Sequence, residues 1–372
     1  MKYAKSYAMD LIAETKQSSL LFLDKVYQGD GFFAYSLEYD RYSKDSNWWG
    51  LANTVFAVKT YHILRSLTSL DEQRKKDIVD FMQSFHRGGG VYSDKLVCRE
   101  TRLYNKLAAI KHFNFSNFFG QKTVIAETRQ AVAALFISGS RPVEMFDDIP
   151  YTVRDVDKYF NSLNWRNIWG AASHVGHLVF FYKMNADLFG HNKGLNQELI
   201  AYCLHKLTIL QNPKDGLWYK QEVSAKQKIN AAMKIISAFN IADKKDIPYA
   251  EKIIDFMLSL KDDYYRNGDG CDNLNSMFVM KYALDSAGPN YKENNVHDFC
   301  WNALDRYKTY AYPEEGGFTF LRNAGPRKWY GMEITKKFSG PDIQGTFMFT
   351  WAISLAAFLL KINWEEFQEI IN

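Results

Sequence analysis

The sequence predicts an all-α protein whose helical hairpins close into one α/α ring. Apolar residues recur three and four positions apart through most of the 372 residues, as on one face of a helix, and strand-like alternation is scarce. Both ends of the chain carry segments with an apolar face, which a closed ring buries without polar capping repeats. These observations favour a single domain over residues 1–372, with about six hairpins of inner and outer helices around a central pocket.

The helical segments follow one another along the chain. Periodicity predicts helices over residues 51–64, 78–85, 124–137, 172–182, 199–210, 229–239, 250–260 and 347–360. The last of these is an apolar run of about 14 residues, whereas a membrane span needs roughly 18 or more. We therefore expect a buried core helix at this position and no membrane span.

Glycine-centred turns separate several of these helices and form a weak internal repeat. In each turn glycine, alone or with acidic residues, precedes a large hydrophobic residue, and an apolar helix follows after a variable loop. The turns lie at residues 29–33, 88–92, 215–219 and 314–318. We find no linker rich in proline, glycine or serine, so the pattern indicates hairpins stacked in sequence within one domain.

Charge and cysteine usage limit the partners and the compartment. The chain has 46 Lys+Arg and 42 Asp+Glu, and its formal charge of +4 is too small and too scattered to indicate a nucleic-acid partner. The four cysteines lie far apart without Cys-x-x-Cys spacing, which is typical of a reducing compartment. The N-terminal segment lacks the apolar core of a signal peptide, so we expect a cytoplasmic protein.

Aromatic residues are unusually abundant. The chain contains 27 Phe, 23 Tyr and 9 Trp, together 16% of its residues. Most of them are expected to fill a large core. Many others, such as Trp49, stand beside glycine and polar residues and predict a pocket lined with rings.

One segment carries a repeat motif. Leu207, Gln211, Gly216 and Trp218 form a Leu-x3-Gln-x4-Gly-x-Trp pattern. This pattern resembles the Gln-Trp repeat that closes helical hairpins in the squalene cyclase and prenyltransferase superfamily. A glutamine there can bond a helix end while the indole stacks on it, so the motif is structural first.

Two further segments strengthen the resemblance. Residues 315–318, and residues 339–346 followed by 347–352, resemble the glycine-phenylalanine turn and the last inner helix of such toroids. The resemblance implies an α/α toroid like that of terpene cyclases, protein prenyltransferases and cobalamin-binding proteins. Polysaccharide lyases and glycosidases share a similar toroid, and a fold alone does not choose among these functions.

The reactive groups of that superfamily are matched only in part. Asp269 and Cys271 resemble the Asp-x-Cys pair of the prenyltransferase zinc site, but Gln344 stands where its histidine is expected, and glutamine is a poor zinc ligand. Asp155 and Asp157 resemble part of the proton-donating motif of terpene cyclases, but basic neighbours favour a charged helix start. We therefore predict no cofactor, while the sequence leaves zinc and magnesium open.

The densest polar and aromatic cluster lies at residues 164–177. Trp165 and Trp169 precede His174 and His177, which stand one helical turn apart and can share a face. One histidine would act as an acid or base while the other orients it. The alternative is that one histidine caps a neighbouring hairpin and the other packs in the core.

The remaining candidates stand at predicted helix starts and turns. Asp272 and Glu315 are candidate catalytic carboxylates beside the two histidines, although capping is the expected role of at least one residue of the Asp272 cluster. The candidates for substrate binding are Trp49, Glu100, Arg102, Glu127, Trp165, Trp169, Trp218, Asn273, Asn275, Asp342 and Gln344.

Three functions fit this pattern. We expect an enzyme that acts on a prenyl or terpenoid substrate, because aromatic walls stabilise carbocations through cation–π attraction. The alternative is a carbohydrate-active lyase or hydrolase in which tryptophans stack on sugar rings and a histidine moves a proton. The third is a non-catalytic toroid that binds a ligand. The expected partner is a small molecule or an oligosaccharide.

Overall fold

The chain is mostly helical. In the computed structural model, helix accounts for 62% of the residues and strand for 5%, which confirms the predicted all-α class. The structure describes residues 2–38, 49–97, 106–107, 110, 121–260, 262–266, 268–329 and 332–370.

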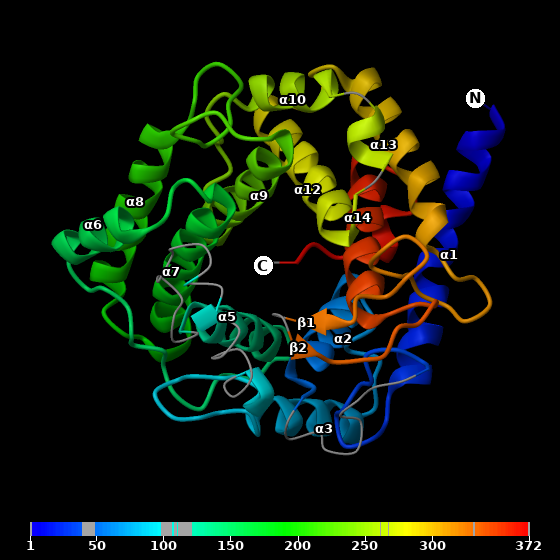
Figure 1. The fold of residues 1–372 in the computed structure, drawn as a ribbon, viewed down its shortest axis with the longest axis horizontal. Coiled ribbons are helices and arrows are strands. Elements are labelled where there is room, and N and C mark those ends of the chain that lie inside the picture. Colours follow the sequence, from blue (N-terminus) through cyan, green and yellow to red (C-terminus); the bar gives the residue numbers. More distant parts are fainter. Residues whose placement is uncertain are drawn as a thin grey trace.

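Six of the described helices form an inner ring (Figure 1). They are α2 (Leu51–Ile63), α5 (Gln121–Ile137), α7 (Ile168–Phe189), α9 (Ala225–Ile241), α12 (Gly270–Ala287) and α14 (Ile343–Leu360). Each helix packs against the next one around the ring, and α14 packs against α2. The predicted helices over 51–64, 124–137, 172–182, 229–239 and 347–360 all fall on this ring.

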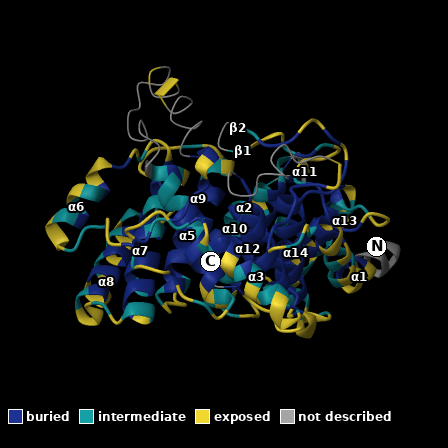
Figure 2. Cartoon of the chain, turned by 90° about the horizontal axis from the view of Figure 1, so that it is seen from below, coloured by how far each residue is buried: buried dark blue, intermediate teal, exposed yellow. Residues whose placement is uncertain are grey.

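A second set of helices lies outside the ring. These are α1 (Lys2–Val26), α3 (Glu72–Gln83), α6 (Val153–Ser162), α8 (Lys193–Leu210), α10 (Ala250–Ser259) and α13 (Glu293–Tyr307). Figure 2 shows exposed residues along α6 and α8, while the inner helices are mostly buried. The shorter elements are α11 (Asp262–Arg266), two 3₁₀ turns (Lys308–Tyr310 and Trp364–Glu366) and the antiparallel strands β1 (Lys328–Trp329) and β2 (Met332–Glu333).

The four glycine-centred turns adopt one common form, which confirms the predicted repeat. Each is closed by an antiparallel bridge, and the bridged pairs are Tyr27 and Phe33, His86 and Tyr92, Gln211 and Trp218, and Ala311 and Phe318. A glycine of positive φ in each turn lies against a neighbouring segment of the chain. At Gly316, a Cβ atom would lie only 2.5 Å from the carbonyl oxygen of Ser18 in α1. The last turn therefore packs on the first helix.

Polar residues fix where the inner helices begin. Asn167 and Asp342 accept hydrogen bonds from the backbone N–H groups of Gly170 and Gly345, three residues further on. Asp269 forms a capping box with Asp272 at the start of α12. These side chains satisfy N–H groups that have no partner within the helix. The starts of α7, α12 and α14 are thereby held around the cavity described below.

The chain closes the other end of the ring with its last described residues. The backbone N–H of Gln368 donates to the carbonyl oxygen of Ile63 over 2.7 Å, where α2 ends. The Lys281 ammonium of α12 donates to Glu369 over 2.7 Å. These contacts join segments that lie about 90 to 300 residues apart along the chain.

Helix α14 is the most apolar element of the ring. Within the described part of the chain, it is the one helix long and apolar enough to cross a membrane, and 83% of that stretch is buried inside the protein. Its aromatic side chains pack against α2, α12 and α13. This burial is what a core helix needs.

Candidate functional site

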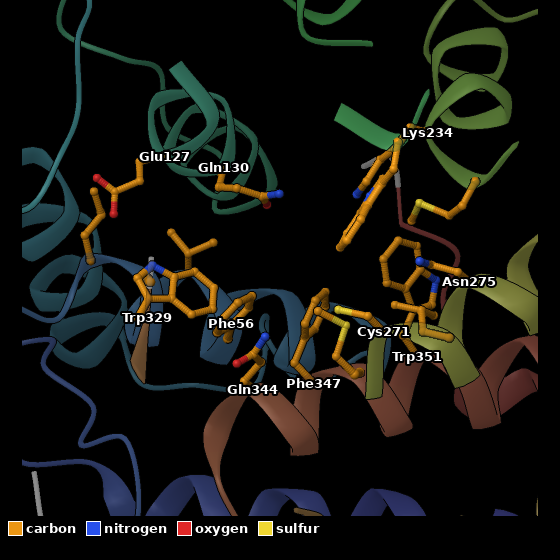
Figure 3. Close-up of a pocket in the computed structure, with 17 residues that line it drawn as sticks. Phe56, Glu127, Gln130, Lys234, Cys271, Asn275, Trp329, Gln344, Phe347 and Trp351 are labelled. Atoms are coloured by element: carbon orange, nitrogen blue, oxygen red, sulfur yellow. The ribbon is translucent and has the colours of Figure 1, made fainter. Parts of the chain in front are cut away.

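A cavity of about 210 Å³ lies in the middle of the inner ring (Figure 3). All six inner helices contribute side chains to it, and Trp329 of β1 covers one side. The first turns of α2, α12 and α14 provide much of the lining. The cavity therefore lies toward the end of the ring at which these helices begin.

One wall of this central cavity is a continuous row of aromatic rings. The Trp329 ring lies 5.6 Å from Phe56, which stacks on Phe347 at 5.1 Å. Phe347 in turn lies 5.6 Å from Trp351. Such rings present a negative π face, which attracts cations and excludes water.

The other side of the central cavity is polar. Figure 3 shows Glu127 and Gln130 on α5, with Phe56 and Phe347 across the cavity. The Lys59 ammonium donates a hydrogen bond to Gln130 Oε1. Asn275 Nδ2 donates to Asn230 over 2.7 Å, so its amide is held in place.

A second cavity of about 320 Å³ adjoins the first one between α5, α7 and α9. Gln130, Trp169 and Lys234 line both cavities. Four polar residues line the second cavity but not the first one: Lys122, Arg129, His174 and His177. Trp169 is 39% exposed and marks the rim. The two cavities together form a site with an aromatic part and a cationic part.

The cationic part contains a buried arginine and a lysine. Arg129 is only 5% exposed, and its Nε atom has no hydrogen-bond partner in the described chain. Burial lowers the pKa of Arg129 to about 10. Burial, and then the Arg129 charge, lower the pKa of Lys234 to about 8. No carboxylate among the described residues forms an ion pair with either side chain.

The two predicted histidines lie side by side in the second cavity. Their ring centroids are 5.6 Å apart in an edge-to-face arrangement. Burial, with Lys122 nearby, lowers the pKa of His174 to about 4. Burial and the neighbouring Arg129 lower the pKa of His177 well below its usual value. Both imidazoles are therefore neutral at pH 7 and able to accept a proton.

Several predicted site residues do line these cavities. They are Glu127, Trp169, His174, His177, Asn275 and Gln344. Gln344 accepts a hydrogen bond from the Tyr35 hydroxyl over 3.3 Å. Glu100 and Arg102 lie outside the described residues.

Other predicted site residues support the fold instead. Asp272 completes the capping box of α12 and also pairs with Lys226 at 2.7 Å. The Asn273 amide donates to the carbonyl oxygens of Gly268 and Asp269, just before that helix. Glu315 is exposed in its turn, where its backbone oxygen accepts a hydrogen bond from Lys25. Polar residues at a helix start satisfy backbone groups first, which is why these candidates do not reach the cavities.

The remaining candidates are packing residues. Trp218 is buried beside its bridge to Gln211, and Trp165 packs on Phe160 at 6.0 Å. Trp49 lies behind the aromatic wall, 6.2 Å from Trp329. Asp342 is buried and accepts hydrogen bonds from the N–H groups of Gly345 and Phe320, both at 2.7 Å. Its carboxylate therefore holds a helix start and a turn together.

The partly matched zinc motif does not form a metal site in the described chain. Cys271 and Gln344 line the central cavity, whereas Asp269 belongs to the capping box. Burial raises the pKa of Cys271 to about 12, so the thiol is neutral. Among the described residues, no three His, Cys, Asp or Glu side chains gather as a metal site would require.

The Asp-x-Asp sequence is a charged helix start, as predicted. Asp155 accepts from Thr152 and pairs with Lys158 at 2.8 Å, and Asp157 pairs with Lys206 at 2.9 Å. The hydrogen bond from Lys158 lowers the pKa of Asp155. An ionised carboxylate on the outer surface is no proton donor for a ligand in the ring.

The sequence predicted a pocket lined with rings but did not indicate which rings line it, and the cations Lys59, Arg129 and Lys234 were not among the predicted site residues. Lys59 and Lys234 were recognisable signals, because each interrupts the apolar pattern of an inner helix. A lysine at a buried helical position needs either a partner or a cavity. The individual rings carried no such signal, since core and cavity aromatics look alike in a sequence.

Comparison with protein-family models, with curated proteins and with solved structures finds no match. The resemblance to the squalene cyclase and prenyltransferase superfamily therefore stays a prediction.

Proposed function

We propose that the ring is an α/α toroid of six helical hairpins in a single domain, and that its two cavities bind a prenyl diphosphate or a related terpenoid anion. The observation that carries this proposal is the division of the site into an aromatic part and a cationic part. Phe56, Phe347 and Trp351 offer apolar rings, while Arg129 and Lys234 offer positive charge. An amphipathic anion matches both parts at once.

The chemistry follows from that arrangement. Arg129 and Lys234 stabilise a diphosphate as it leaves, because fixed charges in a dry site act strongly on developing negative charge. The allylic cation left behind lies against the rings of Phe56, Phe347 and Trp351, which stabilise it. His174 and His177 are neutral bases that accept the proton lost when the cation is quenched to an alkene. The proposed reaction class is a terpenoid cyclisation or elimination.

The cellular setting of the proposal is cytoplasmic. Cys203, Cys271 and Cys300 are free thiols. Free thiols support a reducing compartment.

The test compares four ligands by thermal shift on the full-length protein. Farnesyl diphosphate carries both the chain and the anion, farnesol carries the chain alone, inorganic pyrophosphate carries the anion alone, and an oligogalacturonate is an acidic sugar. We expect the largest stabilisation from farnesyl diphosphate, about 2.7 kcal/mol at a hundredfold excess over its dissociation constant. Release of pyrophosphate together with a hydrocarbon product would then establish turnover.

Matched variants separate the site from general stability. Phe347→Leu removes a ring from the cavity wall, whereas Phe349→Leu, two residues along α14, removes a ring that packs on Tyr310 at 4.5 Å outside the cavity. Only Phe347→Leu should weaken farnesyl diphosphate binding. Equal weakening by both variants, or no binding of any prenyl compound, would contradict the proposal.

A second candidate is a lyase for acidic oligosaccharides. Its supporting observation is Trp169, exposed at the rim beside neutral His174 and buried Arg129, since a lyase needs a base near a group that neutralises the sugar carboxylate. A two-carboxylate hydrolase fits less well, because Glu127 is the one carboxylate among the described lining residues of these cavities. Stabilisation by oligogalacturonate alone would favour the lyase. Binding of a ligand without turnover would favour a non-catalytic toroid.

A further inference from the structure

Lys234 occupies a distinctive position in the ring. It extends from α9 to the place where the two cavities meet and contributes to the lining of both. It makes no ion pair and no hydrogen bond within the described chain. Other lysines of the inner helices do form ion pairs. Lys281 of α12, for example, contacts Asp285 at 2.6 Å and Glu369 at 2.7 Å near the opposite end of the ring.

The surroundings of Lys234 lower its pKa to about 8, so the side chain is mostly charged at pH 7 while a fraction of it is the neutral amine. Burial is the largest cause of the lowered Lys234 pKa, and the positive charge of the Arg129 guanidinium lowers it further. The other titratable groups coupled to it are Cys271, a neutral thiol, and Lys59 and His177, whose charged forms Lys234 itself disfavours. A free lysine amine in a cavity beside a second cation is the arrangement that makes lysine a nucleophile toward carbonyl compounds.

We propose that Lys234 is a covalent attachment site for an aldehyde or ketone that carries an anionic group. Arg129 attracts the anionic group into the second cavity, and the carbonyl carbon then lies within reach of the Lys234 amine. This inference goes beyond the proposed prenyl function and does not depend on it.

The attachment is an imine formation that balances without a further reactant. The nitrogen lone pair of Lys234 forms a bond to the carbonyl carbon, and the C=O π electrons move to oxygen, which takes up a proton. The nitrogen loses one proton to give a carbinolamine. The hydroxyl then takes up a second proton and leaves as water, and the nitrogen loses its second proton, so that a neutral C=N bond remains. Water carries the two protons from nitrogen to oxygen, and there is no net oxidation or reduction.

The test uses pyridoxal 5′-phosphate as the probe, because it joins an aromatic aldehyde to a phosphate. The full-length protein is incubated with the probe, the imine is reduced with borohydride, and the modified lysines are identified by peptide mass spectrometry. We expect Lys234 to be modified at least about 10-fold faster than Lys281 at pH 7.5, with half-maximal rate near pH 8. The control is 5′-deoxypyridoxal, which lacks the phosphate and has no 5′-hydroxyl to close onto the aldehyde. It should lose the preference for Lys234 over surface lysines that the probe shows.

Two variants and one competitor complete the test. Lys234→Arg keeps the charge and abolishes the modification, while Arg129→Gln slows it and moves its pH profile upward. Farnesyl diphosphate should protect Lys234 only if the proposed function also holds, so the two proposals can fail separately. Modification of Lys234 at the rate of surface lysines, or no modification of it in the wild-type protein, would overturn the inference whether or not the variants fold.

Discussion

The contact between the last glycine turn and α1 gives a quantitative test of ring closure. Gly316 has a φ of +82°, which costs a residue with a Cβ atom roughly 1–2 kcal/mol. The Cβ of alanine would also lie 2.5 Å from Ser18 O and 3.0 Å from Phe22 N, both backbone atoms of α1. Overpacking of this kind costs about 1–3 kcal/mol. We therefore expect Gly316→Ala to lower the free energy of unfolding by about 2–5 kcal/mol.

A matched glycine isolates the contribution of the contact. Gly190 ends α7 with a φ of +66°, and a Cβ atom there would meet nothing within 4 Å. Gly190→Ala should therefore cost only the backbone part, roughly 1–2 kcal/mol. Urea denaturation of both variants, followed by far-ultraviolet circular dichroism, measures the difference between them.

Hydrogen exchange shows whether the loss arises at the closure. If the turn at 311–318 holds α1 in the ring, exchange of the α1 amides should accelerate in Gly316→Ala and stay unchanged in Gly190→Ala. Equal losses of stability in the two variants, with α1 equally protected, would refute the reasoning that the last turn closes the ring on the first helix.

Three further expectations concern other parts of the ring. Trp218→Ala should lower the free energy of unfolding by about 3–5 kcal/mol, because it empties a buried site, and Trp169→Ala at the exposed rim should cost far less. The His174 pKa is about 4 in the folded protein and 6.5 ordinarily, so the unfolded chain takes up the proton first as the pH falls. Between pH 6.5 and pH 4 the free energy of unfolding should therefore fall by up to about 3 kcal/mol less in His174→Gln than in the wild type, as measured by urea denaturation. Elemental analysis of the purified protein should find no stoichiometric zinc, and one zinc per chain that is lost in Cys271→Ala would show the opposite.

Much of the fold could be predicted because the spacing of apolar residues in a helix and the residue types of a turn are local properties of the sequence. The helix expected at 51–64 is α2 (Leu51–Ile63), and the helix expected at 347–360 forms most of α14 (Ile343–Leu360). The start of α14 was missed because Gln344 and its neighbours break the apolar pattern. Asp342 caps this start, so the polar residues belong to the helix rather than to a loop.

The site was only partly predictable because a ring brings distant positions together. His174 and His177 were found from a cluster that is local in the sequence, and both line the second cavity. Asp272 and Glu315 looked equally polar, but one caps a helix and the other faces solvent. Nothing in the local sequence distinguishes a carboxylate that caps a helix or faces solvent from one that lines a cavity, as Glu127 does.

The buried cations of the second cavity connect stability with ligand binding. A charge taken out of water lowers stability unless a partner compensates for it, and no described carboxylate pairs with Arg129. A bound anion would supply that partner.

Arg129→Met tests this connection. The variant should have a free energy of unfolding at least as high as that of the wild type when no ligand is present. It removes a buried charge that contacts the Phe180 ring at 5.1 Å but pairs with no described carboxylate. It should also lose the stabilisation that pyrophosphate gives the wild type. The control is Arg74→Met, which removes an ion pair to Asp24 at 3.0 Å and a contact with the Tyr27 ring at 4.1 Å, and it should lower stability without changing the response to pyrophosphate. If Arg129→Met lowers stability and leaves the response to pyrophosphate unchanged, Arg129 is a packing residue. The cationic part of the site would then not be an anion-binding site.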